Sequence, residues 1–216
     1  MHSFTEENYI KSIYHLLVRT QSATTNDIAA VLGTKAASVT DMLKKLADKK
    51  LINYTRYQGV SLTESGEQVA LAVVRKHRLW EYFLVEKLNF KWDEVHEMAE
   101  ELEHITSTKL IDRLDEFMGC PQFDPHGDPI PDVDGRIIQQ QMQPMLVLCK
   151  DQSGTIAGVA NHSPAFLQYL EKTQLTLGQT ITVKEVTDYD LSVQLHTNNK
   201  EFNISHEVAK NLLIII

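Results

Sequence analysis

The sequence predicts a mainly helical protein that ends in a small β domain. In several segments between Thr5 and Ile105, apolar side chains recur at the three- to four-residue spacing of amphipathic helices. From Gln143 onward the pattern changes to short apolar runs broken by Gly and Asn-Asn turns, which is typical of strands. With 216 residues the chain is long enough for several small domains. We expect four segments: a helical head at 1–73, a second helical domain at 74–131, a linker at 132–143 and a β domain at 144–216.

Composition favours a protein of the cytoplasm. The first ten residues are polar and of mixed charge, unlike a signal peptide, and no apolar run is long enough to span a bilayer. Cys120 and Cys149 are too few and too far apart for a disulfide framework or a cysteine-type zinc site. We therefore expect a cytoplasmic protein with no membrane partner.

Charge is distributed unevenly along the chain, whose formal net charge is −8. Residues 1–60 carry eight Lys and Arg against five Asp and Glu, a net charge of +3. Residues 61–216 carry thirteen Lys and Arg against twenty-four Asp and Glu, a net charge of −11. A mildly basic head on an acidic body is compatible with DNA contact at one end.

The head has the pattern of a winged helix-turn-helix. Thr5–Thr20 and a short capped segment, Ile28–Leu32, are predicted helices. After a Gly turn, a longer helix at Lys35–Lys50 carries Lys, Ser and Thr on its polar side, as DNA-reading helices do. Leu51–Leu62 predicts two short strands that turn near Gln58-Gly59 and would form the wing. The alternative is a small helical hairpin with a strand pair that binds no DNA.

A recognition helix in the major groove would place its early exposed residues against base edges. We expect the small and hydroxyl-bearing residues early in this helix to make apolar contacts and hydrogen bonds with bases. We expect the basic residues to contact phosphates. The predicted base-reading residues are Ala36, Ala37, Ser38, Thr40 and Asp41. The predicted phosphate contacts are Lys35, Lys44 and Arg56.

The stretch V-H-E-M-A-E-E-L-E-H-I (Val95–Ile105) carries the strongest functional signal. At helical spacing, His96 and Glu100 share one face with Glu103 and His104. Carboxylates one turn apart repel, and a divalent transition metal would turn that repulsion into ligation. The alternative is an acidic face that is merely solvated.

Two further segments add metal-ligating side chains. His77 and Glu81 lie in the apolar stripe of a preceding helix, where they form either part of a site or a satisfied core pair. Asp124 and His126 project from the proline-rich loop Cys120–Pro131, which alone is an ordinary turn. Three such segments close together in sequence favour one shared metal centre.

These motifs resemble a known family. A winged helix followed by K-H-R-L-W-E (Lys76–Glu81) and V-H-E-M-A-E-E-L-E-H (Val95–His104) is similar to the diphtheria-toxin-repressor family of iron- and manganese-dependent regulators. The resemblance implies a metal site that joins a first-helix residue to three later ligands, here Asn8, Glu100, Glu103 and His104. It implies a neighbouring site at His77, Glu81 and His96, to which the loop residues Asp124 and His126 contribute in some relatives.

Three positions either depart from the family pattern or distinguish between its iron-type and manganese-type branches. Iron-type members have a cysteine where this chain has Glu100, so the resemblance favours Mn²⁺, with Fe²⁺ as the alternative. The first-helix ligand is usually Met or Asp, and here it is the neutral Asn8. Lys11 stands where manganese-type relatives often have a second acid, which argues against a closely spaced pair of ions.

The C-terminal segment predicts a small SH3-like barrel, a domain that family members often carry. A helix is expected around Pro164–Lys172. The predicted strands are Met145–Cys149, Ile181–Val186, Leu191–His196, Glu201–Ile204 and Leu212–Ile216. The resemblance implies that this domain can lend a ligand, for which His162 and Asn161 are candidates, although either can equally be an ordinary loop residue.

The resulting hypothesis is a homodimeric, metal-activated DNA-binding regulator, expected to repress metal-uptake genes at a palindromic operator. A metal would fix the DNA-reading heads, and without it repulsion among Glu97, Glu100 and Glu103 and a loose first helix would leave them misaligned. Candidates for the dimer surface, or else for the core, are Leu79, Trp80, Phe83, Leu110, Leu114 and Phe117. One alternative is a di-metal carboxylate enzyme, for which a second E-x-x-H and four long helices are not evident. The other is a DNA-binding module whose acidic helix is only solvated.

Overall fold

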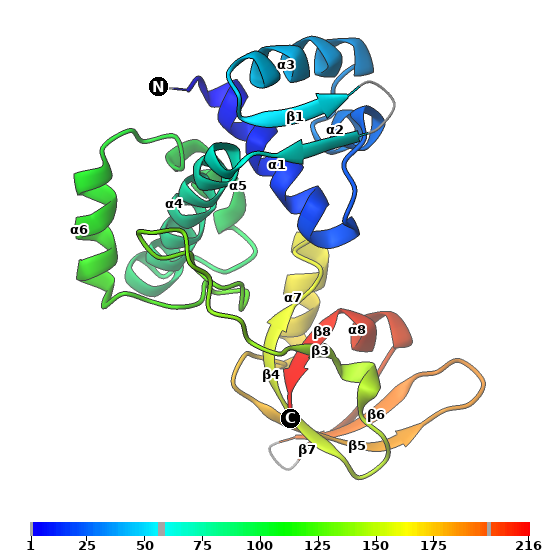
Figure 1. Cartoon of the computed structure of the whole chain (residues 1–216). Helices are drawn as coiled ribbons and strands as arrows, with labels where there is room; N and C mark the ends of the chain where they lie inside the picture. The colour runs from blue at the N-terminus through cyan, green and yellow to red at the C-terminus, as the bar shows by residue number, and fades with distance from the viewer. Residues whose placement is uncertain (1, 56–58, 198–199) are drawn as a thin grey trace. The chain divides into compact units, whose positions relative to one another are not determined.

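The computed structural model describes residues 2–55, 59–197 and 200–216 (Figure 1). The chain divides into two compact units. The first unit comprises Met1–Trp80, Ala99–Phe117 and Pro131–Ile137. The second comprises Glu81–Met98, Met118–Ile130 and Ile138–Ile216. Among the described residues, no helix combines the length and the apolar character that crossing a bilayer requires.

The head of the first unit is a winged helix-turn-helix, as predicted. It consists of α1 (Phe4–Thr20), α2 (Thr25–Val31), α3 (Ala36–Asp48), β1 (Ile52–Thr55) and β2 (Gly59–Leu62) (Figure 1). The two strands pair antiparallel, while the expected turn residue Gln58 lies outside the described residues. Capping boxes start α1 and α2, because the Ser3 and Thr24 side chains each accept a backbone N–H from the third helical residue. The apolar faces of the three helices meet in one buried core that includes Ile10, Ile13, Ile28, Leu43 and Leu46.

Three further helices carry the acidic part of the chain: α4 (Glu64–Leu88), α5 (Val95–Leu102) and α6 (Thr108–Met118). The expectation that Glu103 and His104 belong to the helix with His96 is wrong, since α5 ends at Leu102 and both residues lie in the following turn. The Glu103 N–H nevertheless donates to Ala99 O at 2.8 Å, so this residue keeps its helical position. The helix α6 had no counterpart among the predicted elements.

Burial separates the candidates for a dimer surface. Leu79 and Leu114 are buried, so these two residues belong to the core of the protein rather than to an exposed dimer surface. Leu110 and Phe117 are exposed on α6, and Phe117 has 69% of its surface accessible. Exposed large apolar side chains on one helix remain candidates for a partner surface.

The second unit holds a six-stranded antiparallel sheet with the order β3-β8-β4-β5-β6-β7, which is the small β domain that the sequence predicts. The strands are β3 (Gln143–Pro144), β4 (Ser153–Val159), β5 (Thr180–Val186), β6 (Val193–Thr197), β7 (Lys200–Ile204) and β8 (Leu212–Ile215). Two helices, α7 (Pro164–Thr173) and α8 (His206–Asn211), accompany the sheet (Figure 1). Its core includes Ile156, Leu167, Leu170, Ile181 and Leu195.

One predicted strand of this unit is wrong. The segment Met145–Cys149 begins with a 3-10 turn, η1 (Met145–Val147), rather than a strand. Met145 and Leu148 are both buried, and a three-residue spacing brings two side chains to the same side of a 3-10 turn. Strand β4 and helix α8 were not predicted at all.

Candidate metal centre and nucleic-acid interface

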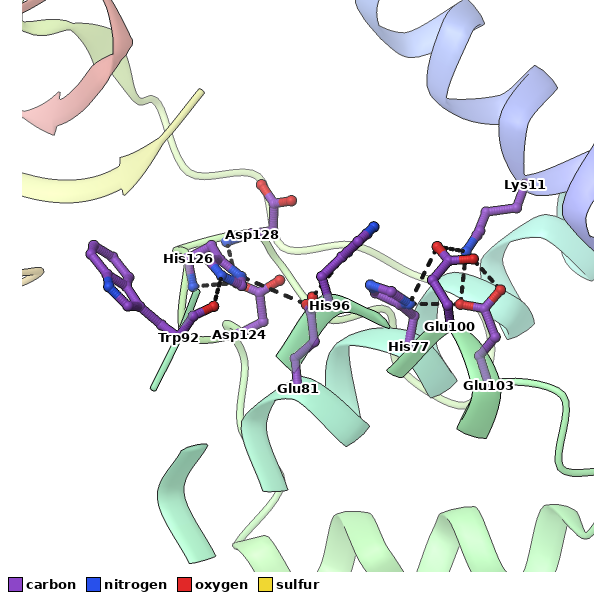
Figure 2. Close-up of polar contacts among 10 residues, drawn as sticks. All are labelled: Lys11, His77, Glu81, Trp92, His96, Glu100, Glu103, Asp124, His126 and Asp128. Carbon is purple, nitrogen blue, oxygen red and sulfur yellow. Dashed lines mark hydrogen bonds and ion pairs between the residues drawn. The ribbon is translucent and has the colours of Figure 1, made fainter. Parts of the chain in front are cut away.

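A cluster of charged side chains joins α1 to α5 within the first unit. Lys11 Nζ on α1 lies 2.6 Å from Glu100 Oε1, and 2.6 and 2.7 Å from the two carboxylate oxygens of Glu103. Figure 2 shows the Lys11 side chain reaching both carboxylates from the first helix. On the other side, His77 Nδ1 on α4 lies 2.6 Å from Glu103 Oε2. Three helices therefore converge on Glu103, whose side chain is fully buried.

The charge state of Glu103 follows from these neighbours. Burial by itself raises the pKa of this carboxyl, because it disfavours the charged form. The hydrogen bond from His77 and the positive charge of Lys11 outweigh burial and hold the pKa of Glu103 below its ordinary value. Glu103 is therefore a carboxylate at neutral pH, as a metal ligand must be.

His104 is held by α1 as well. Its Nδ1 lies 2.7 Å from Glu7 Oε2, and its ring stacks on Phe4 with the ring centroids 4.7 Å apart. Its Nε2 lies 3.8 Å from Glu103 Oε1. If Nδ1 donates to Glu7, the Nε2 lone pair faces Glu103, which is the arrangement that metal-ligating histidines usually have.

Asn8 supplies an observation that bears directly on metal binding. Its Oδ1 atom is buried and accepts no hydrogen bond from any described residue. A buried carbonyl oxygen without a partner costs free energy unless something else satisfies it. Asn8 lies between Glu7 and Lys11 on the same helix, and both of these neighbours contact the cluster. The donor chemistry present on these elements, an amide oxygen with two carboxylates and an imidazole, therefore fits a divalent cation.

One expectation about the metal-free protein is wrong for this cluster. The carboxylates of Glu100 and Glu103 do not face each other uncompensated, because the Lys11 ammonium lies between them. The sequence placed Lys11 near this site through the resemblance alone, without indicating the contacts that it makes.

A second cluster lies within the second unit. Glu81 on α4 and the loop residues Asp124 and His126 are all buried, and one ligand atom of each lies within 4.8 Å of those of the others. His126 Nδ1 lies 3.7 Å from Glu81 Oε2 and 3.9 Å from Asp124 Oδ1. That nitrogen is buried and forms no hydrogen bond with the described residues. Two carboxylates around an imidazole nitrogen form a plausible cation site (Figure 2).

The loop that carries Asp124 and His126 is rigid for local reasons. The Asp124 carboxylate accepts the backbone N–H groups of His126 and Asp128 at 2.8 and 2.9 Å, which forms an Asx-type turn. Gly127 has a φ of +90°, and a Cβ there would lie 2.1 Å from Ala157 O on β4. Only glycine allows this close approach.

His126 is oriented from both ends of its ring. Its Nε2 lies 2.9 Å from Trp92 O, so Nε2 donates to that carbonyl and Nδ1 faces the carboxylates. Burial by itself lowers the pKa of His126, but the carboxylates of Glu81 and Asp124 outweigh it and raise the pKa to about 9. Trp92 was not among the predicted site residues, because a backbone carbonyl leaves no signal in a sequence.

The remaining predicted ligands lie at the edges of these clusters. His96 Nδ1 is 3.5 Å from Glu81 Oε1, although 60% of the His96 side chain is exposed. His162 stacks on His126 with the ring centroids 4.9 Å apart. Asn161 Oδ1 accepts the backbone N–H of Ser163 at 2.9 Å, as an ordinary turn residue does.

The predicted DNA-contacting residues lie on α3 or next to it. Lys35, Ala36, Ala37, Ser38, Asp41 and Lys44 are exposed, and Thr40 is half-buried. The Thr40 hydroxyl donates to Ala36 O at 2.9 Å, and Lys44 Nζ lies 3.2 Å from Asp41 Oδ1. Arg56 lies outside the described residues. A hollow beside α3 is also lined by Thr24, Thr25, Asn26, Tyr54 and Gly59, none of which the sequence had singled out for DNA contact.

Three family models match consecutive parts of the chain. The iron dependent repressor N-terminal DNA binding domain matches residues 1–60. The iron dependent repressor metal binding and dimerisation domain matches residues 63–132. The FeoA domain matches residues 144–215.

Curated relatives agree with these models. The iron-dependent repressor IdeR of Mycobacterium tuberculosis is 33% identical over 127 residues, which is 59% of this chain and 55% of that protein. The chain thus matches little more than half the length of such relatives. The HTH-type transcriptional regulator MntR of Lysinibacillus sphaericus is 31% identical over 119 residues, which is 55% of this chain and 85% of that protein.

Solved structures extend the similarity to nearly the whole chain. A manganese-dependent transcriptional repressor in complex with manganese has a TM-score of 0.87 and 31% identity, covering 97% of this chain and 99% of that one. The IdeR structure from T. acidophilum has a TM-score of 0.76 and 28% identity, and both chains are covered completely. These proteins are transcriptional repressors rather than enzymes, which removes the support for a di-metal enzyme. The chain therefore belongs to the iron-dependent repressor family of metal-dependent, DNA-binding transcriptional regulators.

Proposed function

We propose that this protein is a metal-activated transcriptional repressor of metal-uptake genes. The observation that carries the proposal is the buried Asn8 Oδ1 atom, which accepts no hydrogen bond from the described residues and lies on a helix of the DNA-reading head. An ion bound by that oxygen and by Glu100, Glu103 and His104 ties α1 to the end of α5. The ion supplies a fixed positive charge that draws these ligands into one geometry.

The donor set favours Mn²⁺ as the effector. Asn8, Glu100, Glu103 and His104 offer oxygen and imidazole nitrogen atoms and no thiolate, which suits Mn²⁺ better than softer ions. The manganese complex among the similar structures supports the same choice. Fe²⁺, the ion of the IdeR relatives, is the alternative effector.

We propose a second metal site at Glu81, Asp124 and His126, with His96 at its edge. The three buried groups lie close together and the His126 Nδ1 atom forms no hydrogen bond within the described chain. His77 is better assigned to the first site, because its Nδ1 lies 2.6 Å from Glu103. This assignment differs from the expected grouping of His77 with Glu81 and His96.

DNA binding follows from the winged head. Ala36, Ala37, Ser38 and Asp41 are exposed on α3, and we expect these residues and Thr40 to meet base edges. Lys35 and Lys44 meet phosphates, as Arg56 is also predicted to do. A homodimer, for which the exposed apolar residues of α6 are candidates, presents two such heads to a palindromic operator.

The decisive experiment measures metal-dependent operator binding by a Glu103 variant. Glu103→Gln keeps the size of the side chain but removes the charge that an ion needs. In gel-shift titrations on genomic fragments, wild-type protein should bind with Mn²⁺ and release DNA with excess EDTA. The variant should lose the Mn²⁺ response while circular dichroism shows a folded protein.

The matched control is Glu97→Gln, an exposed acid on the same segment. It should behave as wild type. DNA binding by wild-type protein that persists unchanged after exhaustive chelation would contradict the proposal and would favour a DNA-binding module with a merely solvated acidic helix. Parallel titrations with Fe²⁺ under anaerobic conditions decide between the two effectors.

A further inference from the structure

Lys11 is a buried cation at the centre of the first cluster. Only 7% of its surface is accessible, and its ammonium group contacts three carboxylate oxygens at 2.6–2.7 Å. An ammonium group has three N–H donors, so these contacts satisfy all of them. The lysine therefore does what a bound cation would do: it neutralises charge and bridges Glu100 to Glu103.

The bridge is also a connection between helices. Lys11 belongs to α1, whereas Glu100 belongs to α5 and Glu103 follows it. Breaking the contact would leave a buried ammonium without its carboxylate partners and a fully buried carboxylate with only His77 beside it, which is unfavourable. The contact therefore favours the docked arrangement of α1 on the end of α5 without any metal.

An incoming divalent ion needs the same oxygen atoms. Both oxygens of Glu103 and one of Glu100 already face the ammonium, so an ion that ligates Glu103 would lie beside a positive charge and compete with Lys11 for these oxygens. Two carboxylates and one ammonium carry a net charge of −1, so the ammonium halves the negative charge that the two carboxylates would offer to a divalent ion. The lysine is thus a competitor as well as a substitute.

We propose that Lys11 is a tethered internal cation that docks α1 on α5 in the metal-free protein and competes with the activating ion for Glu100 and Glu103. This inference rests on the proposed function, since it concerns the same ion site. The lysine has two opposite effects: it stabilises the metal-free protein and it weakens metal binding. An ion activates the protein only at concentrations sufficient to displace the ammonium.

Removing the ammonium separates this role from a purely structural one. In Lys11→Met, the segment 99–105 of the chelated full-length protein should exchange its amide hydrogens faster and the Tm should fall, because α1 loses its anchor. In the same variant the Kd for Mn²⁺, measured by calorimetry, should fall by about ten-fold or more, because the repelling charge has gone. A structural lysine would instead lower stability and metal affinity together, and that result would overturn the proposal.

Two further variants keep the test decisive. Lys11→Gln retains a hydrogen-bonding side chain and should show the same gain in Mn²⁺ affinity with a smaller loss of stability. Lys109→Met removes an exposed positive charge from α6 in the same unit and should change neither quantity. Unchanged exchange in both Lys11 variants would also overturn the proposal.

Failure of the proposed function would look different. In that case the wild-type protein would bind neither Mn²⁺ nor Fe²⁺ with a measurable Kd. The exchange measurement on chelated Lys11→Met still reports whether the ammonium holds the segment 99–105. Metal binding by wild type with no gain in the variants would overturn the competition and leave the proposed function intact.

Discussion

The orientation of single side chains decides what the first cluster can bind. Glu7 is not a predicted ligand, yet its carboxylate lies 2.7 Å from His104 Nδ1 and so determines which ring nitrogen faces Glu103. Carboxylates that hold a ligating histidine in this way commonly contribute 10- to 100-fold to metal affinity. Glu7 is therefore a positioning residue for the proposed metal ligand.

We predict that Glu7→Gln weakens Mn²⁺ binding by roughly ten-fold with little loss of folded stability. The amide can still accept a hydrogen bond, but it no longer favours an electron-rich imidazole. Calorimetric titration of the variant beside wild type measures the change. A Kd equal to that of wild type would show that Glu7 does not act through His104.

Local spacing in the sequence could group the proposed ligands that are close in sequence, but it could not connect residues that are distant. Glu100, Glu103 and His104 could be found from the helical pattern, and the pattern holds for Glu103 because its N–H bonds to Ala99 O although α5 has ended. Lys11 is 92 residues away from Glu103, so no periodicity connects them. The neutral Asn8 has no signal of its own, and only the resemblance identified it.

At the scale of helices, one carboxylate joins α1 to the recognition helix α3. Glu6 closes the capping box of α1 and is buried. Its carboxylate also lies 2.9 Å from Lys45 Nζ and 2.7 Å from Lys49 Nζ, near the end of α3. Burial by itself raises the pKa of Glu6, but the two lysines and the Ser3 N–H outweigh it and lower the pKa from 4.5 to about 2.

This shift predicts a pH dependence of stability. A carboxyl whose pKa is lower in the folded state stabilises the fold above its unfolded pKa, and that contribution is lost as the pH falls from about 4.5 towards 2. Glu6→Gln should therefore lower the free energy of unfolding by about 1 kcal/mol at neutral pH. The difference from wild type should narrow as the pH falls through this window.

Urea unfolding of both proteins at a series of pH values measures the effect, with the exposed Glu86→Gln as control. For the control, the difference in unfolding free energy from wild type should not change with pH in this way. A deficit for Glu6→Gln that stays constant down to the lowest pH would mean that packing rather than charge is responsible.

Elements whose residues break simple patterns were the ones that the sequence did not reveal. Strand β4 contains Gly154 and Gly158, which weaken a strand pattern. A Cβ at Gly154 would lie 2.6 Å from Ile214 Cδ1, so a larger residue there would force the end of the Ile214 side chain to move. The segment at Met145 was mistaken for a strand because a short apolar run does not distinguish a strand from a 3-10 turn.

At the scale of the whole molecule, the order of domains followed from periodicity, whereas the proposed coupling between DNA and metal binding depends on one shared helix, α1. Tyr9, Ile10 and Ile13 of α1 pack in the core of the DNA-reading head. Glu7 and Lys11 of the same helix contact the residues that end α5. In the proposed mechanism, a change at the metal site would therefore reach the DNA-reading head through a single helix.

A shared helix predicts reciprocal binding. If Mn²⁺ raises operator affinity by some factor, operator DNA must raise Mn²⁺ affinity by the same factor, which for coupled sites is typically about 5- to 150-fold.

Fluorescence anisotropy gives the operator Kd with Mn²⁺ and with EDTA, and calorimetry gives the Mn²⁺ Kd with and without a saturating duplex. Glu103→Gln should reduce both factors to about one, because it removes a ligand without touching the DNA-reading surface. If the two factors for wild type differed beyond error, a further equilibrium such as dimerisation would have to carry part of the coupling. If the duplex left Mn²⁺ affinity unchanged while Mn²⁺ still controlled operator binding, the two-site account based on α1 would be wrong.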